Sequence, residues 1–191
     1  MPCYRHGMSE VPESLNRPRP IVEMPALAAR AAEMLRMPET LLPLDEAEAK
    51  QVVARMVTIG FRPGSTVLRE GDGRRSDYML LLLEGEVQVD TRAGLDRDAL
   101  AIAVDGPGSI IGEMSLLDGA PRSATCTAMG SVLAAGLSRK GLEALIAEQP
   151  RTAAKLMMGV AQRIADRLRA LGQQLHMMAE ITGGPRGRPR T

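Results

Sequence analysis

The residues best suited to binding chemistry lie between positions 108 and 129, in the sequence GSIIGEMSLLDGAPRSATCTAM. Glu113 is a carboxylate that can accept hydrogen bonds, and the guanidinium fork of Arg122 suits two phosphate oxygens. Ser123 adds a hydroxyl beside the arginine. These residue types predict a site for an anion such as the phosphate ester of a ribose. Two alternatives are a surface ion pair between Glu113 and Arg122, and a Ser123 hydroxyl bonded to backbone at a strand start.

The backbone between these side chains is also suited to an anion. Gly112 lets the backbone approach a ligand closely because it has no Cβ. Residues 114–117 can form one helical turn whose free N–H groups face the anion. A Gly-Ala-Pro bend at residues 119–121 then allows Arg122 to reach back over that turn. The stretch therefore predicts an anion cradle with Glu113 and Arg122 at its two ends.

The composition limits the class of protein in which this cradle can lie. The chain has 191 residues, 45% of them hydrophobic, which is enough for one core with extensions. A net charge of +1 gives no overall field that would attract nucleic acid or anionic lipid. No signal-peptide core and no apolar run of membrane-spanning length is present, so we expect a soluble protein without a membrane partner.

The sequence contains no recognisable set of catalytic or metal-ligating residues. Its two histidines, His6 and His176, lie outside the predicted strands, so neither a barrel metal site of the cupin type nor a histidine-assisted nucleophile is expected. Cys3 and Cys126 are far apart and form no metal-binding spacing. We therefore expect no enzyme, no metal and no cofactor, and a reduced, cytoplasmic setting.

The order of segments predicts a mainly β protein with flanking helices. Short apolar runs with glycine punctuation over residues 57–138 favour a β-roll of the jelly-roll class. Asp45 and Glu48 form a capping-box pattern before a helix, and Ser138 is a cap for another. The predicted parts are a flexible proline-rich arm (1–25), N-terminal helices (26–56), the β-roll (57–138), C-terminal helices (139–181) and a disordered basic tail (182–191).

A long helix is predicted after Pro150, from residue 151 to about 181. Apolar residues recur at every third or fourth position and form one continuous stripe. A helix of about 30 residues is about 45 Å long, which exceeds the width of a domain of this size. A parallel helix pair at a two-fold dimer axis is therefore favoured over packing on its own roll alone.

The stretch GSIIGEMSLLDGAPRSATCTA resembles the phosphate-binding cassette of cyclic nucleotide-binding domains, and PGSTVLREGD and DYMLLLLEGEVQV are similar to early strands and turns of that fold. The resemblance covers roughly residues 45–180 and implies a double-stranded β-helix. It also implies a cyclic nucleotide as ligand, with cAMP favoured and cGMP possible. By position, Glu113 would accept the ribose 2′-hydroxyl and Arg122 would neutralise the cyclic phosphate. The implied ligand-binding residues are Gly112, Glu113, Met114, Ser115, Arg122, Ser123, Arg163 and Arg167.

The long helix carries the clearest departure from the resemblance. Arg163 matches an arginine near the ligand in catabolite activator protein-like sensors, but the hydroxyl residues that read adenine there are replaced by Arg167 and Leu168. Arg167 is suited to a guanine edge, or to an ion pair with Asp166 or with a carboxylate of the roll. The sequence does not decide between these.

The end of the sequence bears on whether the protein acts on DNA or on a partner protein. Transcription factors of this family continue into a helix-turn-helix, whereas this sequence ends in ITGGPRGRPRT. We therefore expect a cyclic-nucleotide receptor that signals to an unknown effector protein through its C-terminal helix. The alternatives are a nucleic-acid-associated regulator whose Arg-Gly-Arg tail binds DNA as an AT-hook does, and a degenerate fold that serves as a dimeric interaction module.

Overall fold

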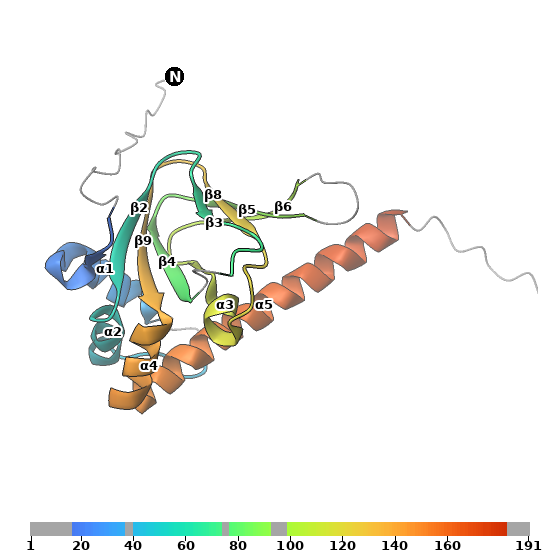
Figure 1. Ribbon diagram of the computed structural model, residues 1–191. Coiled ribbons are helices and arrows are strands. Elements are labelled where there is room, and N and C mark those ends of the chain that lie inside the picture. Colours follow the sequence, from blue (N-terminus) through green and yellow to red (C-terminus); the bar gives the residue numbers. More distant parts are fainter. Residues whose placement is uncertain (1–16, 37–39, 74–76, 93–98, 183–191) are drawn as a thin grey trace, which may run out of the picture.

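The computed structural model describes residues 17–36, 40–73, 77–92 and 99–182. Two antiparallel sheets face each other as a roll, with strand orders β1-β2-β9-β4-β7 and β3-β8-β5-β6 (Figure 1). The predicted mainly β fold with flanking helices is confirmed, and the two sheets do not close on each other. The strands are β1 (Arg19–Pro20), β2 (Val57–Phe61), β3 (Thr66–Leu68), β4 (Tyr78–Glu84), β5 (Val87–Arg92), β6 (Ala99–Asp105), β7 (Ile110–Ile111), β8 (Thr125–Ala128) and β9 (Val132–Ser138).

Strand β4 separates two apolar clusters. Its residues 79–83 are all buried, as expected for a strand covered on both faces. Met79, Leu81 and Leu83 pack into the cluster under the helices, whereas Leu80 and Leu82 point into the interior of the roll. The alternation follows from the two-residue period of a strand. The roll therefore has its own apolar interior, distinct from the core that holds the helices.

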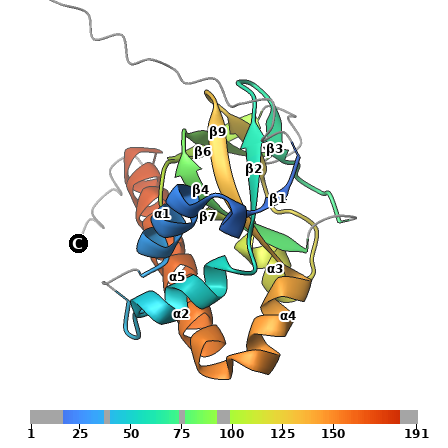
Figure 2. The ribbon, with the colours of Figure 1, turned by 90° about the vertical axis from the view of Figure 1, so that its left-hand side faces the viewer.

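The helices gather on one side of the roll, except that α5 runs across it and beyond (Figures 1 and 2). The predicted capping box at Asp45 and Glu48 and the predicted Ser138 cap are both present. A three-residue 3-10 helix, η2 (Ile21–Glu23), precedes the first α-helix. The α-helices are α1 (Pro25–Leu35), α2 (Glu46–Val53), α3 (Glu113–Asp118), α4 (Arg139–Glu148) and α5 (Pro150–Thr182).

Three polar contacts fasten the α4–α5 region to α2 and the residues just after it, and we call them the α2–α5 seam. Lys155 Nζ donates to Glu48 Oε2 at 2.6 Å, Thr152 Oγ1 donates to Gln51 Oε1 at 2.7 Å, and Arg55 pairs with Glu148 at 2.5 Å. As one partner advances along the chain the other retreats by the same number of residues, so the two segments run antiparallel in one register. The start of α5 is thus fixed in position along its axis.

The apolar stripe of α5 is covered only in its first half. Leu156 and Val160 are buried and Ile164 packs on the same core. Leu168, one turn further on, is 69% exposed. At this position the stripe is therefore apolar surface that the described residues of the chain leave uncovered.

One expectation about local structure is wrong, and one short strand was not predicted. Residues 19–23 belong to the fold rather than to a loose arm, because β1 pairs with β2 and Ile21 is fully buried beneath α1. Ile21 N also donates to Met56 O, a contact that the proline content of the segment conceals. Strand β7 was not expected within the cradle, but Ile110 and Ile111 pair with β4.

Candidate functional site

The site is built on the segment of residues 108–123, which we call the cassette. Strand β7 anchors its start, and α3 begins immediately afterwards at Glu113. Gly112 is the residue before α3 and has a left-handed φ of +75°. An ideal Cβ at this position would lie 2.4 Å from Arg122 Nη1 and 3.1 Å from Leu68 Cδ1. Glycine is therefore required both by the backbone conformation and by the close approach of the Arg122 side chain.

Arg122 is folded inward at the centre of the cassette. Its side chain bonds through Nη1 to Gly112 O at 2.7 Å and through Nη2 to Tyr78 O at 2.8 Å, and its guanidinium lies 4.5 Å from the Tyr78 ring centroid. Arg122 is only 4% exposed. No carboxylate of the described residues forms an ion pair with it. Its positive charge is therefore buried against neutral carbonyl groups and an aromatic face.

Glu113 is likewise buried, at 6% exposed, and forms no ion pair within the described part of the chain. The alternative of a surface ion pair between Glu113 and Arg122 is therefore wrong, because both groups are buried and each is held separately. Desolvation raises the pKa of the Glu113 carboxyl above its usual value, opposed by a hydrogen bond to its own backbone and by the nearby Arg167 and Arg122. A ligand hydroxyl that donates to this carboxylate would offset part of that desolvation.

The remaining cassette residues differ in exposure. Ser115 is buried, and its carbonyl accepts from Arg139 Nη2 at 3.0 Å, which ties α3 to the start of α4. Met114 and Ser123 lie on the rim, where the Ser123 hydroxyl contacts Met114 Sδ at 3.8 Å. Strand β8 begins only at Thr125, and no backbone bond of the Ser123 hydroxyl is found among the described residues. The alternative, a Ser123 hydroxyl bonded to backbone at a strand start, is therefore wrong.

A cavity of about 250 Å³, which we call the roll cavity, brings these groups together. Charged and polar groups of the cassette line it together with apolar side chains of the roll interior. Burial raises the pKa of the Cys126 thiol in this wall to about 12, so the thiol stays protonated at neutral pH. The lining residues are Leu68, Val89, Ile111, Gly112, Glu113, Met114, Ser115, Arg122, Ser123, Ala124, Cys126, Arg167 and Leu171.

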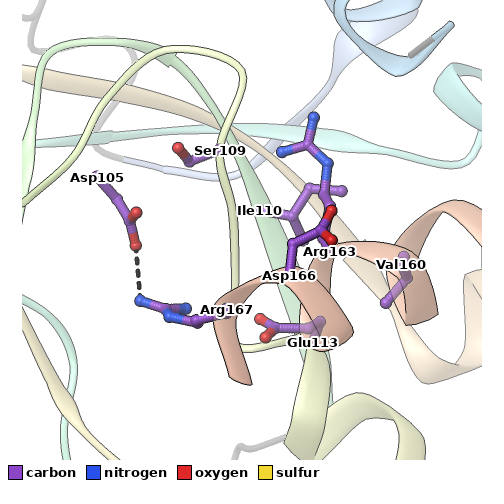
Figure 3. Close-up of a pocket in the computed structure, with 8 residues that line it drawn as sticks. All are labelled: Asp105, Ser109, Ile110, Glu113, Val160, Arg163, Asp166 and Arg167. Carbon is purple, nitrogen blue, oxygen red and sulfur yellow. Dashed lines mark hydrogen bonds and ion pairs between the residues drawn. The ribbon is translucent and has the colours of Figure 1, made fainter. Parts of the chain in front are cut away.

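A second cavity of about 220 Å³, the helix cavity, lies between α5 and the turn that follows β6 (Figure 3). Arg163 Nη1 donates to Gly108 O at 2.8 Å, and Arg167 Nη2 forms an ion pair with Asp105 Oδ2 at 3.0 Å. Figure 3 shows this ion pair at one side of the cavity, with Glu113 nearby at the start of α3. Because Glu113 and Arg167 line both cavities, the two spaces adjoin at these side chains.

All eight residues expected at the site line one or both of the adjoining cavities. A family model for the cyclic nucleotide-binding domain matches residues 58–149, which include the cassette. The chain belongs to the cyclic nucleotide-binding domain family. This agrees with the resemblance seen in the cassette sequence. The roles of the individual site residues remain predictions.

Similar proteins include two domains of known structure and a bacterial transcriptional regulator. A cyclic nucleotide-binding domain from Methylobacillus flagellatus is 30% identical, with a TM-score of 0.72 over 85% of this chain and 88% of that one. The N-terminal domain of a transcriptional regulator from Streptomyces coelicolor is 31% identical, with a TM-score of 0.61 over 70% of this chain and 93% of that one. A CRP-like cAMP-activated global transcriptional regulator of Mycobacterium tuberculosis is 30% identical over 106 residues. The matched residues are 56% of this chain and 46% of the M. tuberculosis regulator. The chain therefore spans about half the length of the curated relatives that it matches.

Sequence reasoning missed two residues that shape the site. Tyr78 supplies the carbonyl and the ring that hold Arg122, and Asp105 holds Arg167. Asp105 carried a usable signal, because it is an acid that ends the apolar run ALAIAV. The role of Tyr78 depends on its carbonyl and on a contact 44 residues away, which no local pattern reveals. The Arg-Gly-Arg segment of residues 186–188 lies outside the described residues.

The described residues contain no group of three or more histidine, cysteine, aspartate or glutamate side chains placed to hold a metal ion. No helix in the described part of the chain is both long enough and apolar enough to cross a membrane.

Proposed function

We propose that this protein is a non-catalytic receptor for a cyclic purine mononucleotide that signals to a partner protein through α5. The observation that carries the proposal is the buried charge of Arg122, which has no carboxylate partner among the described residues. A buried cation is costly unless an anion neutralises it. A cyclic phosphate in the roll cavity would supply that anion.

The hydrogen-bonding capacity of Arg122 fits this role. A guanidinium has five N–H donors, and the bonds to the Gly112 and Tyr78 carbonyls leave others for phosphate oxygens. The same two bonds fix the plane of the guanidinium, so little side-chain freedom is lost on binding. Glu113, at the start of α3, would accept a ribose hydroxyl, and the apolar wall of the roll cavity would cover the sugar and base.

The proposed ligand class also agrees with the relatives. The M. tuberculosis relative is named as cAMP-activated, which favours cAMP as a ligand, with cGMP as a second candidate. Named relatives of this kind are regulators, which supports a non-catalytic role.

The exposed second half of the α5 stripe supports a homodimer formed through this helix. The apolar surface around Leu168 would be covered by the same helix of a second copy. Sedimentation tests this part of the proposal, and a monomer at all concentrations would exclude the helix pair.

Calorimetry with cAMP and cGMP tests the receptor role. We expect wild type to bind at least one nucleotide, and Arg122→Ala to lose about 3–5 kcal/mol of binding free energy, because a paired buried charge is removed. Since Arg122 also bonds to two carbonyls, Arg122→Lys serves as a second variant that keeps the charge while losing the planar fork. Arg30→Lys, in a partly exposed ion pair with Glu84, is the matched control and should bind like wild type.

The receptor role is excluded if wild type binds no cyclic nucleotide below about 100 μM, a concentration that corresponds to roughly 5.5 kcal/mol. It is also excluded if folded Arg122→Ala and Arg122→Lys proteins, verified by circular dichroism, both bind as tightly as wild type.

A further inference from the structure

Tyr78 contacts Arg122 with two different groups. Its carbonyl accepts from Arg122 Nη2 at 2.8 Å, and its ring centroid lies 4.5 Å from Arg122 Cζ. Arg122 lines the roll cavity, whereas Tyr78 lines neither of the two cavities. Tyr78 therefore presents no surface to a ligand in the roll cavity, and it can act on such a ligand through Arg122.

The position of Tyr78 is fixed by the sheet and not by a ligand. Tyr78 is the first residue of β4 and is paired with Ser138 of β9, and Met79, which follows it, is buried. Its side chain packs against the apolar cluster of the roll interior. The carbonyl and the ring are thus presented to Arg122 by a strand that is already paired and packed.

The ring gives Arg122 a partner that does not compete with an anion. An aromatic face attracts a guanidinium through its quadrupole, and the attraction is stronger in a desolvated site. Arg122 is 4% exposed and has no carboxylate partner among the described residues. A carboxylate in the place of the ring would neutralise the guanidinium, and a phosphate would have to displace it. The ring stabilises the cation without a negative charge, so the positive charge stays available to a phosphate.

The ring also limits the orientation of the guanidinium. It covers one face of the guanidinium plane, while the carbonyls of Gly112 and Tyr78 accept from Nη1 and Nη2. The N–H groups that remain therefore point in fixed directions. Without the ring the guanidinium has one contact fewer, and the population of this orientation falls. The apparent affinity for a phosphate falls by the same fraction.

We propose that the ring of Tyr78 is a positioning group of the site, which holds the Arg122 cation ready for a phosphate where a carboxylate would block it. This inference rests on the proposed receptor function. It goes beyond that function by assigning a role to a side chain outside both cavities, and by giving a reason why that side chain is aromatic rather than acidic.

Four substitutions at position 78 separate the ring from the other properties of the residue. Tyr78→Phe keeps the ring, and Tyr78→Leu keeps an apolar side chain without a ring. Tyr78→Glu and Tyr78→Gln are a matched pair of similar shape that differ in charge. Calorimetry with cAMP and cGMP measures the affinities, and urea unfolding without ligand measures the stability of each variant, after circular dichroism has verified its fold.

Affinity and stability should change in different orders. Tyr78→Phe should retain an affinity within about threefold of wild type, whereas Tyr78→Leu and Tyr78→Gln should bind about tenfold more weakly because the ring is lost. Tyr78→Glu should bind about a hundredfold more weakly, because its carboxylate pairs with Arg122. Without ligand, Tyr78→Glu should be at least as stable as Tyr78→Gln, since the pair neutralises a buried charge. A purely structural role would lower affinity and stability in the same order.

Phe61→Leu is the matched control for loss of an aromatic ring. Phe61 packs against the same apolar cluster as Tyr78 and lines neither cavity. Its replacement should lower the stability and leave the nucleotide affinities unchanged, because Phe61 does not contact Arg122.

Two results would overturn the inference while the receptor function stands. In the first, Tyr78→Leu binds as tightly as Tyr78→Phe, so the ring does not position Arg122. In the second, Tyr78→Glu binds as tightly as Tyr78→Gln, so a carboxylate at this place does not compete with the phosphate. If wild type binds neither nucleotide, the receptor function fails and this inference fails with it.

Discussion

The cassette and α5 both place arginines at the cavities, but they hold them in different ways. Arg122 of the cassette is buried and bonded to two backbone carbonyls. Arg167 of α5 is partly exposed and held by the Asp105 carboxylate. Backbone carbonyls neither titrate nor change with side-chain substitution, whereas an ion pair depends on one replaceable residue. The arginine of the cassette is therefore a fixed part of the fold, whereas the position of the α5 arginine depends on one other side chain.

The same difference extends to what supports each region. The cassette is supported by the roll through β7 and by the steric fit of Gly112 against Arg122. The start of α5 is supported by the α2–α5 seam, which consists of side-chain contacts. The cassette should therefore be most sensitive to substitutions that change its backbone conformation. The position of α5 should be most sensitive to substitutions that remove a charged side chain.

The largest expected effect comes from Gly112→Ala. The added Cβ is strained at a φ of +75° and meets Arg122 Nη1 at 2.4 Å, so we expect a loss of about 3 kcal/mol in the free energy of unfolding. Binding of any cyclic nucleotide should weaken as Arg122 is displaced. Gly64→Ala is the control, because Gly64 has a φ of +74° with no atom within 4 Å. Equal losses in urea unfolding of the two variants would show that the fit against Arg122 contributes nothing.

An intermediate effect is expected for Lys155→Met in the α2–α5 seam. It leaves the nearly buried Glu48 without its ionic partner, which we expect to cost about 2 kcal/mol of stability. Lys50→Met removes an exposed pair with Glu46 on the same helix and should cost much less stability, because water screens that pair. Denaturant midpoints of the two variants measure the difference. Similar small losses would contradict the conclusion that the seam anchors α5.

The smallest expected effect is that of Glu113→Gln on stability. Because burial raises the pKa of this carboxyl above 4.5, the folded protein binds more protons than the unfolded chain, and stability falls as pH rises from 4.5 through the folded pKa. The glutamine lacks this term, so the variant should gain about 1 kcal/mol at neutral pH and lose the gain at low pH. Thermal unfolding from pH 4 to 7 checks this, with exposed Glu143→Gln as control. A gain that does not depend on pH would refute it.

Most of the fold could be predicted because its signals are local. Strand alternation, glycine turns and the caps at Asp45 and Ser138 each depend on neighbouring residues, and the structure contains them. Ile21 could not be placed, because its burial depends on pairing with a strand that lies more than thirty residues away. The residues that would contact a ligand were brought to the cavities as expected, but the inward fold of Arg122 onto Tyr78 was not foreseen. That contact joins strand β4 to the cassette, so it exists only once the roll has formed.

The α2–α5 seam has a mechanical consequence. It fixes α5 near Lys155, and the helix continues to Thr182. At 1.5 Å per residue this leaves a rod of about 40 Å beyond the fixed point. A tilt of about 10° at Lys155 would move the far end of such a rod by about 7 Å. A displacement of about 1 Å at Arg167, roughly 18 Å from the fixed point, would thus be amplified about twofold at the tip, as in a lever.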